Sequence, residues 1–115
     1  MGQPEKLYTA LSEERRWLAL QCIREHRTIA LADLAELVAE AEEGEDVQEI
    51  PEEEVRNVYV SLYHVHVPLL AEVDLAQYDQ ERDLVAVTDR TESILDSVAD
   101  QLRELRGTRG QETSS

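Results

Sequence analysis

The stretch PEEEVRNVYVSLYHVHVPLLAEV, residues 51–73, decides the fold that we predict for this chain of 115 residues. Pro51 suits the first turn of a helix, and the three glutamates after it stabilise the positive end of the helix dipole. Apolar side chains then recur at helical spacing and predict a core-facing stripe of Val55, Val58, Tyr59, Leu62, His66, Leu69 and Val73. Because proline lacks the backbone N–H that a helix interior needs, we expect a kink at Pro68 before the helix continues to Val73.

A helix is also predicted near the N-terminus of the chain. Ser12 is a suitable N-cap, and the apolar spacing carries the helix to about His26. Its core face should consist of Leu11, Leu18, Ala19, Cys22 and Ile23. Trp17 and Leu20 lie beside that face, which leaves them as candidate contacts for a partner.

The remaining elements surround the stretch 51–73. Residues 27–30 tolerate an extended conformation, and residues 31–41 repeat the apolar spacing of a helix. The acidic stretch 42–49 has little to bury and is predicted to be a loop. Residues 75–78 and 84–88 are predicted to be the two strands of a β-hairpin, joined by a polar turn.

A last helix is predicted to begin at Thr88 or Asp89, where Asp89 and Glu92 resemble a capping box. Its apolar residues follow at spacings of three, four and three, which is typical of a coiled-coil seam. We expect this helix to build a homodimer, and packing onto its own domain is the alternative. The expected dimer interface comprises Trp17, Leu20, Ile94, Leu95, Val98, Leu102 and Leu105.

The order helix, strand, helix, helix, hairpin, helix predicts a mainly helical α+β fold of the winged helix-turn-helix type. It has three helices, a two-stranded hairpin wing and an added C-terminal helix. We expect a flexible N-terminus at 1–10, the winged-helix domain at 11–88, a dimerisation helix at 89–106 and a disordered tail at 107–115.

The charge balance indicates the solvent in which this chain works. Acidic residues outnumber basic ones by 26 to 11, and only Lys6 is a lysine. In molar salt, hydrated carboxylates keep a surface soluble, and their mutual repulsion is weak because the Debye length at 1 M is about 3 Å. An ordinary acidic protein would explain the acidity but not the near-absence of lysine. The composition therefore predicts a halophile, and acidity alone is then a weak argument against nucleic acid as a partner.

Several classes of protein are disfavoured by the sequence. No apolar run approaches the ~18 residues of a membrane span, and the N-terminus lacks a signal peptide, so we expect a cytoplasmic protein without a membrane partner. Cys22 is the single cysteine and cannot form an internal disulfide. No catalytic constellation or phosphate-binding glycine loop is evident, so we expect no enzyme, no cofactor and no small-molecule substrate.

A metal site is not expected either. Cys22 and His26 lie four residues apart on a predicted helix, but two ligands without others nearby are a weak signal. His64 and His66 lie two residues apart and do not share a helix face. We expect His66 to be a core histidine with a hydrogen-bonding neighbour, and His64 to be exposed.

Three segments carry a resemblance to a known family. They are LSEERR at 11–16, LADLA at 31–35 and VSLYHVHVPLL at 60–70. Together they resemble a family of small haloarchaeal winged-helix proteins of unassigned function, over roughly residues 11–88. The resemblance implies a DNA-binding-like fold and a regulatory role, with no catalytic residues. Members often have glycine near Val73-Asp74, whereas this chain has none there.

In a winged helix, the third helix enters the major groove and the wing approaches the backbone or the minor groove. Arginine can bind guanine and asparagine adenine through paired hydrogen bonds, and an exposed Val60, with Val67 beside it, could contact thymine methyl groups. The residues that we expect at double-stranded DNA are Arg56, Asn57, Val60, Ser61, His64 and Arg82. The alternative is a protein-interaction module that keeps the fold without binding DNA.

Overall fold

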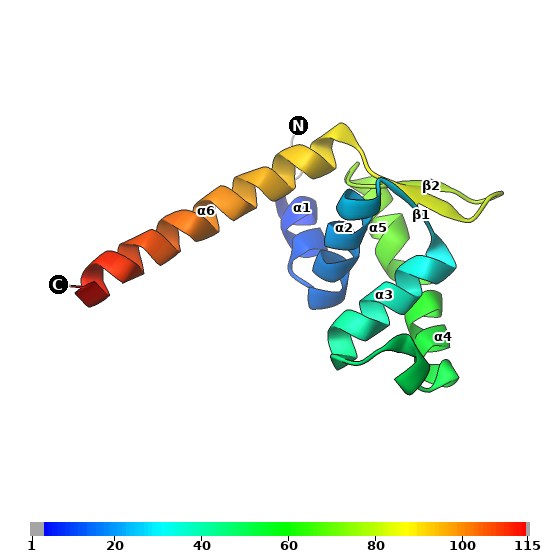
Figure 1. The fold of residues 1–115 in the computed structure, drawn as a ribbon. Coiled ribbons are helices and arrows are strands. Elements are labelled where there is room, and N and C mark those ends of the chain that lie inside the picture. Colours follow the sequence, from blue (N-terminus) through cyan, green and yellow to red (C-terminus); the bar gives the residue numbers. More distant parts are fainter. Residues whose placement is uncertain (1–3, 115) are drawn as a thin grey trace.

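A computed structural model describes the backbone of residues 4–114, and the side chains of this range except those of residues 4–6, 8, 102 and 105–114. The elements, in chain order, are the helices and strands α1 (Pro4–Leu11), α2 (Glu14–His26), β1 (Thr28–Ala30), α3 (Leu31–Glu43), η1 (Val47–Glu49), α4 (Glu52–Ser61), η2 (Leu62–His66), α5 (Val67–Glu72), β2 (Gln77–Asp79), β3 (Leu84–Ala86) and α6 (Asp89–Ser114). Figure 1 shows a helical body with a hairpin on one side and α6 extending away from it on another. No helix within the described range is long and apolar enough to cross a membrane.

The three strands form one antiparallel sheet in the order β1-β3-β2. Ile29 of β1 and Tyr78 of β2 both pair with Val85 of β3, whose side chain is completely buried. The predicted fold class is therefore confirmed: the chain is a mainly helical α+β protein whose helices α2, α3 and α4–α5 carry a β-hairpin wing, with α6 added after it. The acidic loop contains one short 3-10 turn, η1, that the sequence did not predict.

The core forms between α2, α3, the α4–α5 segment and the sheet. Its largest fully buried side chains are Leu20, Ile23, Leu31, Leu34, Val38, Leu62, Val67, Leu70, Leu75 and Val85. The predicted inner face of α2 was partly wrong. Leu20 is fully buried, whereas Leu18 and Cys22 are only half-buried. The reason is that Arg16 also points inward, so the apolar pattern of α2 does not mark its buried face.

The helix that begins after Pro51 continues to Glu72, and a π-helical turn at Leu62–His66 interrupts its regular pitch before Pro68, where the kink was predicted. The segment η2 is a π-helical turn, in which the Val67 backbone N–H donates to Leu62 O, five residues back. Pro68 follows directly and has no N–H to donate, which leaves room for this wider turn. The extra residue in the turn rotates the face that α5 presents to the core.

The N-terminus differs from the prediction of a flexible segment over 1–10. Residues 4–11 form α1, and the side chain of Ala10 is fully buried. An eight-residue helix is too short to be stable alone, so its order comes from contacts with the body. Those contacts are the apolar packing of Leu7, Ala10 and Leu11 on the core and the hydrogen bonds of an α2 side chain that is described below.

The turn after α5 adopts a left-handed backbone without glycine. Asp74 has φ +63°, and the Leu75 N–H donates to Leu70 O at 2.8 Å, which is the bond that closes a Schellman motif. Aspartate tolerates this conformation better than most residues. Thr88 Oγ1 donates to Asp74 O at 2.8 Å, so the turn also fixes the start of α6.

The cap of α6 lies one residue earlier than the predicted capping box. Thr91 N donates to Thr88 Oγ1 and Thr88 N donates to Thr91 Oγ1, each at 3.1 Å. The hydroxyl of Thr91 is completely buried and bonds to Leu75 O. Burial of this polar cap ties the first turn of α6 to the sheet.

Candidate nucleic-acid interface

Four of the residues predicted to contact DNA form one exposed strip on the outer side of α4 and η2. Arg56, Asn57, Val60 and His64 are all exposed, and Val60 has 44% of its surface accessible. Their spacing places them along a single helix face. Among the described residues, no hydrogen bond or ion pair is found for Arg56 or Asn57. We call these four residues the outer strip.

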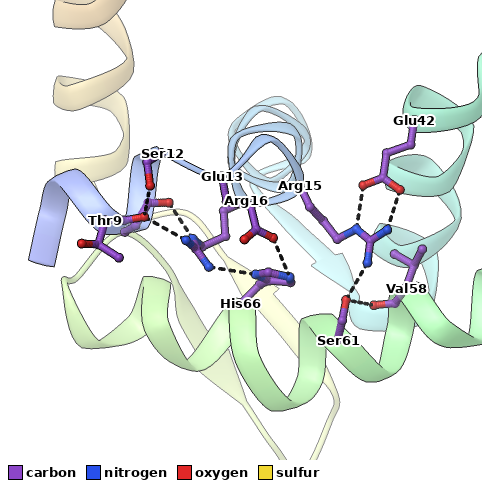
Figure 2. A network of polar contacts seen from close by, with 10 residues as sticks. Thr9, Ser12, Glu13, Arg15, Arg16, Glu42, Val58, Ser61 and His66 are labelled. Atoms are coloured by element: carbon purple, nitrogen blue, oxygen red, sulfur yellow. Dashed lines mark hydrogen bonds and ion pairs between the residues drawn. The ribbon is translucent and has the colours of Figure 1, made fainter.

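Ser61 does not belong to the outer strip, contrary to the prediction. Its hydroxyl accepts a hydrogen bond from Arg15 Nη1 at 3.0 Å and donates to Val58 O at 3.0 Å. Arg15 also binds Glu42 through two hydrogen bonds of 2.6 and 2.8 Å, which raise the pKa of its guanidinium (Figure 2). Ser61 therefore helps to join α4 to α2 and α3.

Val67 was also placed wrongly by sequence reasoning. It is 1% exposed, and the exposed valine beside the outer strip is Val65, at 52%. The cause is the π-helical turn, which inserts one residue relative to an α-helix and shifts the face of every side chain after it.

The wing carries Arg82 at its tip. The side chain of Arg82 is 77% exposed, and its Nε lies 3.8 Å from a carboxylate oxygen of Asp79. Asp79 also accepts hydrogen bonds from the backbone N–H groups of Glu81 and Arg82, which closes the turn between the strands. Arg82 is thus exposed to solvent on a turn that the side chain of Asp79 stabilises.

A cluster of tyrosines that the sequence analysis missed joins the wing to the third helix. Asp83, with φ +58°, accepts hydrogen bonds from the hydroxyls of Tyr59 (2.7 Å) and Tyr78. The ring of Tyr63 lies between them, 6.4 Å from that of Tyr59 and 6.1 Å from that of Tyr78. The bond to Asp83 raises the pKa of Tyr59, and burial together with the same carboxylate raises the pKa of Tyr78. The sequence feature that could have predicted this cluster is that Tyr59 and Tyr63 are four residues apart on a predicted helix, while Tyr78 lies on a predicted strand.

The consequence of this cluster is geometric. Asp83 and its two tyrosine partners hold the hairpin against the helix that carries the outer strip. The position of Arg82 relative to the outer strip is therefore fixed. We call Asp83, Tyr59 and Tyr78 the wing clamp.

Exposed carboxylates lie on the elements that carry the outer strip and Arg82. Glu52, Glu53 and Glu54 are exposed at the beginning of α4, and Asp79 and Glu81 are exposed on the wing. Against these five acidic side chains stand the guanidinium groups of Arg56 and Arg82. The face is therefore acidic on balance, with its two arginines at separate places.

A second polar network binds α1 to the body. Arg16 of α2 is only 6% exposed, and its Nε and Nη2 donate to Ala10 O at 2.7 Å and Thr9 O at 2.8 Å (Figure 2). Its Nη1 lies 3.1 Å from His66 Nδ1, and His66 Nε2 lies 3.5 Å from Glu13. His66 is thus the buried, hydrogen-bonded histidine that its position in the core stripe predicted, and His64 is exposed as expected. Burial lowers the pKa of His66, Glu13 opposes this, and the nearby Arg16 and Arg15 lower it further.

The residues expected at a dimer interface separate into three groups. Leu20 is fully buried and Leu95 is 4% exposed, so both are covered within their own chain, which corrects the prediction for these two. Trp17, Ile94 and Val98 are half-buried. Leu102 and Leu105 have side chains outside the described residues. The first turns of α6 thus pack on the body, as the alternative held. Ion pairs of Arg24 in α2, and of Arg27 directly after it, with α6 carboxylates stabilise the junction.

Metal and thiol chemistry find no support in the described residues. No group of three metal-ligand side chains is found in the part of the chain that the structure describes. The ring of His26 lies 3.0 Å from Cys22 O, which is a backbone contact within one helical turn and involves no thiol. Burial raises the pKa of the Cys22 thiol, which disfavours the reactive thiolate.

Comparison with known proteins identifies the family. A family model described as a domain of unknown function, DUF7344, matches residues 8–86. The match runs from the end of α1 through the last strand of the wing and stops before α6. No curated protein and no solved structure matches the chain. Since the matched segment covers more than half of the sequence, the chain belongs to the DUF7344 family.

Proposed function

We propose that this chain is a cytoplasmic DNA-binding protein of a halophilic archaeon, a transcriptional regulator that acts as a homodimer on double-stranded DNA. The observation that carries the proposal is the outer strip: Arg56, Asn57, Val60 and His64 share one exposed helix face beside a wing that ends in Arg82. The same helix is held from behind by the core, and the wing clamp fixes the wing to it. Rigid presentation of polar side chains beside a wing is what groove recognition needs.

Each residue of this face has a chemical role in the proposal. Arg56 can bind guanine and Asn57 adenine through paired hydrogen bonds, while Val60 contacts a thymine methyl group. His64 extends the strip by another turn, and Arg82 reaches a phosphate. The carboxylates of Glu52 to Glu54 oppose phosphate, and molar salt reduces that repulsion because the Debye length is then about 3 Å.

Molar salt also removes most of the free energy that DNA-binding proteins ordinarily gain when counterions are released from the DNA. Affinity must then come from direct hydrogen bonds, apolar contact and the doubling of contacts in a dimer. No cofactor, metal or small-molecule substrate enters the proposal.

A second candidate function is a protein-interaction module that has kept the fold without binding DNA. The observation that favours it is the combination of five carboxylates on the elements that carry the outer strip and Arg82 with two exposed valines, Val60 at 44% and Val65 at 52%. A basic partner with a small apolar patch would complement such a face.

Recovery of bound DNA from the native host, across the genome, tests the two candidates against each other. We expect enriched sites, and binding to one of them in molar salt should weaken by about 10- to 100-fold in Arg56→Ala, since one base-contacting arginine contributes about 1–3 kcal/mol. Arg90→Ala is the matched control, because Arg90 is equally exposed but lies at the start of α6. Absence of enriched sites would favour the interaction module.

A further inference from the structure

The part of α6 beyond the body is the feature that the proposed function leaves unexplained. Ion pairs with α2 reach as far as Asp96, and grooves shared with α2 reach Val98 and Ala99. The side chains of Ala99, Asp100, Gln101, Arg103 and Glu104 are all exposed. Figure 1 shows the helix continuing well past the other elements. A helix of 16 residues, 99–114, is only marginally stable in water by itself. A partner for this segment is therefore expected on energetic grounds.

The charges of α6 are divided between its two halves. Residues 89–100 contain four carboxylates and one arginine, whereas residues 101–110, which we call the arm, contain Arg103, Arg106 and Arg109 with a single glutamate. Two parallel copies of α6 would place like charges together. Two antiparallel copies place the basic arm of each against the acidic half of the other, which lowers the electrostatic energy.

A groove with matching chemistry lies where α6 leaves the body. It has a volume of about 560 Å³ and is lined by Leu11, Ser12, Glu13, Glu14, Trp17 and Val98. Its floor is apolar, and its edge carries carboxylates of which Glu14 is exposed and unpaired among the described residues. We call it the Trp17 groove.

The sequence of the arm complements this groove. In the sequence, Leu102 and Leu105 continue the spacing of Leu95 and Val98, and Arg106 and Arg109 follow these leucines by four residues each, a spacing typical of residues that neighbour one another on a helix. An apolar pair flanked by arginines matches an apolar floor edged by glutamates. From Val98 to Leu105 the helix rises about 10 Å, so two antiparallel helices that cross near residue 102 bring each arm over the other copy's groove.

We propose that a second copy of this chain occupies the Trp17 groove: the arm of each protomer lies antiparallel to α6 of its partner, with its leucines over Trp17 and its arginines beside Glu14. The inference rests on the homodimer of the proposed function and specifies its interface. Both grooves are filled in a two-fold arrangement, so the contact closes and does not propagate. Trp17, half-buried in a single chain, becomes covered.

Charge exchange across the interface tests the arrangement. Glu14→Arg alone and Arg106→Glu with Arg109→Glu should each raise the dimer dissociation constant by about tenfold, while all three changes together should restore much of the affinity. Sedimentation equilibrium at about 0.5 M salt measures this, because the Debye length of about 4 Å there leaves contact pairs effective. Glu36→Arg, at an exposed site on α3, is the matched control and should leave the dissociation constant unchanged.

Fluorescence provides an independent measurement, since Trp17 is the single tryptophan of the chain. Its emission should shift to shorter wavelength as protein concentration rises through the dissociation constant. Three results would each overturn the interface: a monomer at all concentrations, a dimer indifferent to both charge reversals, or a dimer whose Trp17 emission does not shift.

The proposed function is judged separately by the Arg56→Ala experiment. A monomer that still binds its recovered DNA sites overturns the interface and leaves DNA binding standing. A dimer with the expected charge-exchange pattern supports the interface even where no DNA is recovered.

Discussion

The two helices that flank the winged-helix body, α1 and α6, are attached to it by opposite means. The short α1 is docked by one buried polar side chain, Arg16, which bonds the carbonyls of its last turn. The long α6 is docked by the apolar contact of Leu95 and by ion pairs at the surface, and then continues beyond the body. The comparison shows that a short helix can be docked by a buried arginine together with the apolar packing of Leu7, Ala10 and Leu11. At the other end of the chain, α6 continues beyond the part that the body covers.

Leu95→Ala is the change expected to loosen α6 most. Leu95 is 4% exposed, and its truncation should lower the free energy of unfolding by about 3 kcal/mol, since a buried leucine loses both burial and packing. Arg24→Ala is the control for the surface ion pairs of the same junction and should cost less than about 1 kcal/mol. Denaturant unfolding measures both, and equal losses would show that the ion pairs contribute as much to holding α6 as the apolar contact does.

Arg16→Ala should release α1 at a cost of about 2 kcal/mol. The change removes hydrogen bonds from a charged donor to two carbonyls, of Thr9 and Ala10, inside a nearly buried site. Amide hydrogen exchange should rise in residues 7–11 and stay unchanged in α3. Protection of α1 that survives the substitution would mean that Ala10 and its apolar neighbours suffice to dock the helix.

Lowering the pH should weaken the attachment of α1, because His66 becomes protonated. This is the smallest of the three effects predicted here. Burial and the adjacent Arg16 lower the pKa of His66 from its ordinary 6.5, so the folded state favours the neutral ring. The unfolded chain then binds more protons as pH falls through 6.5, and stability should be constant above that pH and decline below it until the folded pKa is reached. His66→Gln should flatten this part of the profile. If the free energy of unfolding of the wild-type protein stays constant to about 0.3 kcal/mol between pH 7 and pH 5, the predicted role of His66 is wrong.

Sequence reasoning was most successful where local signals and burial agree. Pro51 with its three glutamates and the apolar stripe that follows predicted the third helix, because each is a property of neighbouring residues. The exposed positions of Arg56, Asn57, Val60 and His64 followed from that stripe. The same argument misplaced Val67, because a π-helical turn cannot be recognised from a period of 3.6 residues.

The sites that could not be predicted from the sequence depend on residues far apart in the chain. Asp83 lies 24 residues from Tyr59, and Arg16 lies 50 residues from His66, so neither the wing clamp nor the α1 attachment has a local pattern. Asp74 in a left-handed turn was concealed for a different reason: glycine is the usual signal there, and this chain uses aspartate.

By itself, the sequence determined that this protein is a small, strongly acidic α+β chain with a winged-helix order of elements and an amphipathic C-terminal helix. Helix caps, apolar periods and turn residues act over a few positions, so they can be recognised without coordinates. Only the tertiary structure decided which arginines are exposed and which are used inside: Arg15 and Arg16 hold the body together, while Arg56 and Arg82 face solvent. The physical reason is that the partners of a charged side chain are set by chain segments brought together in folding.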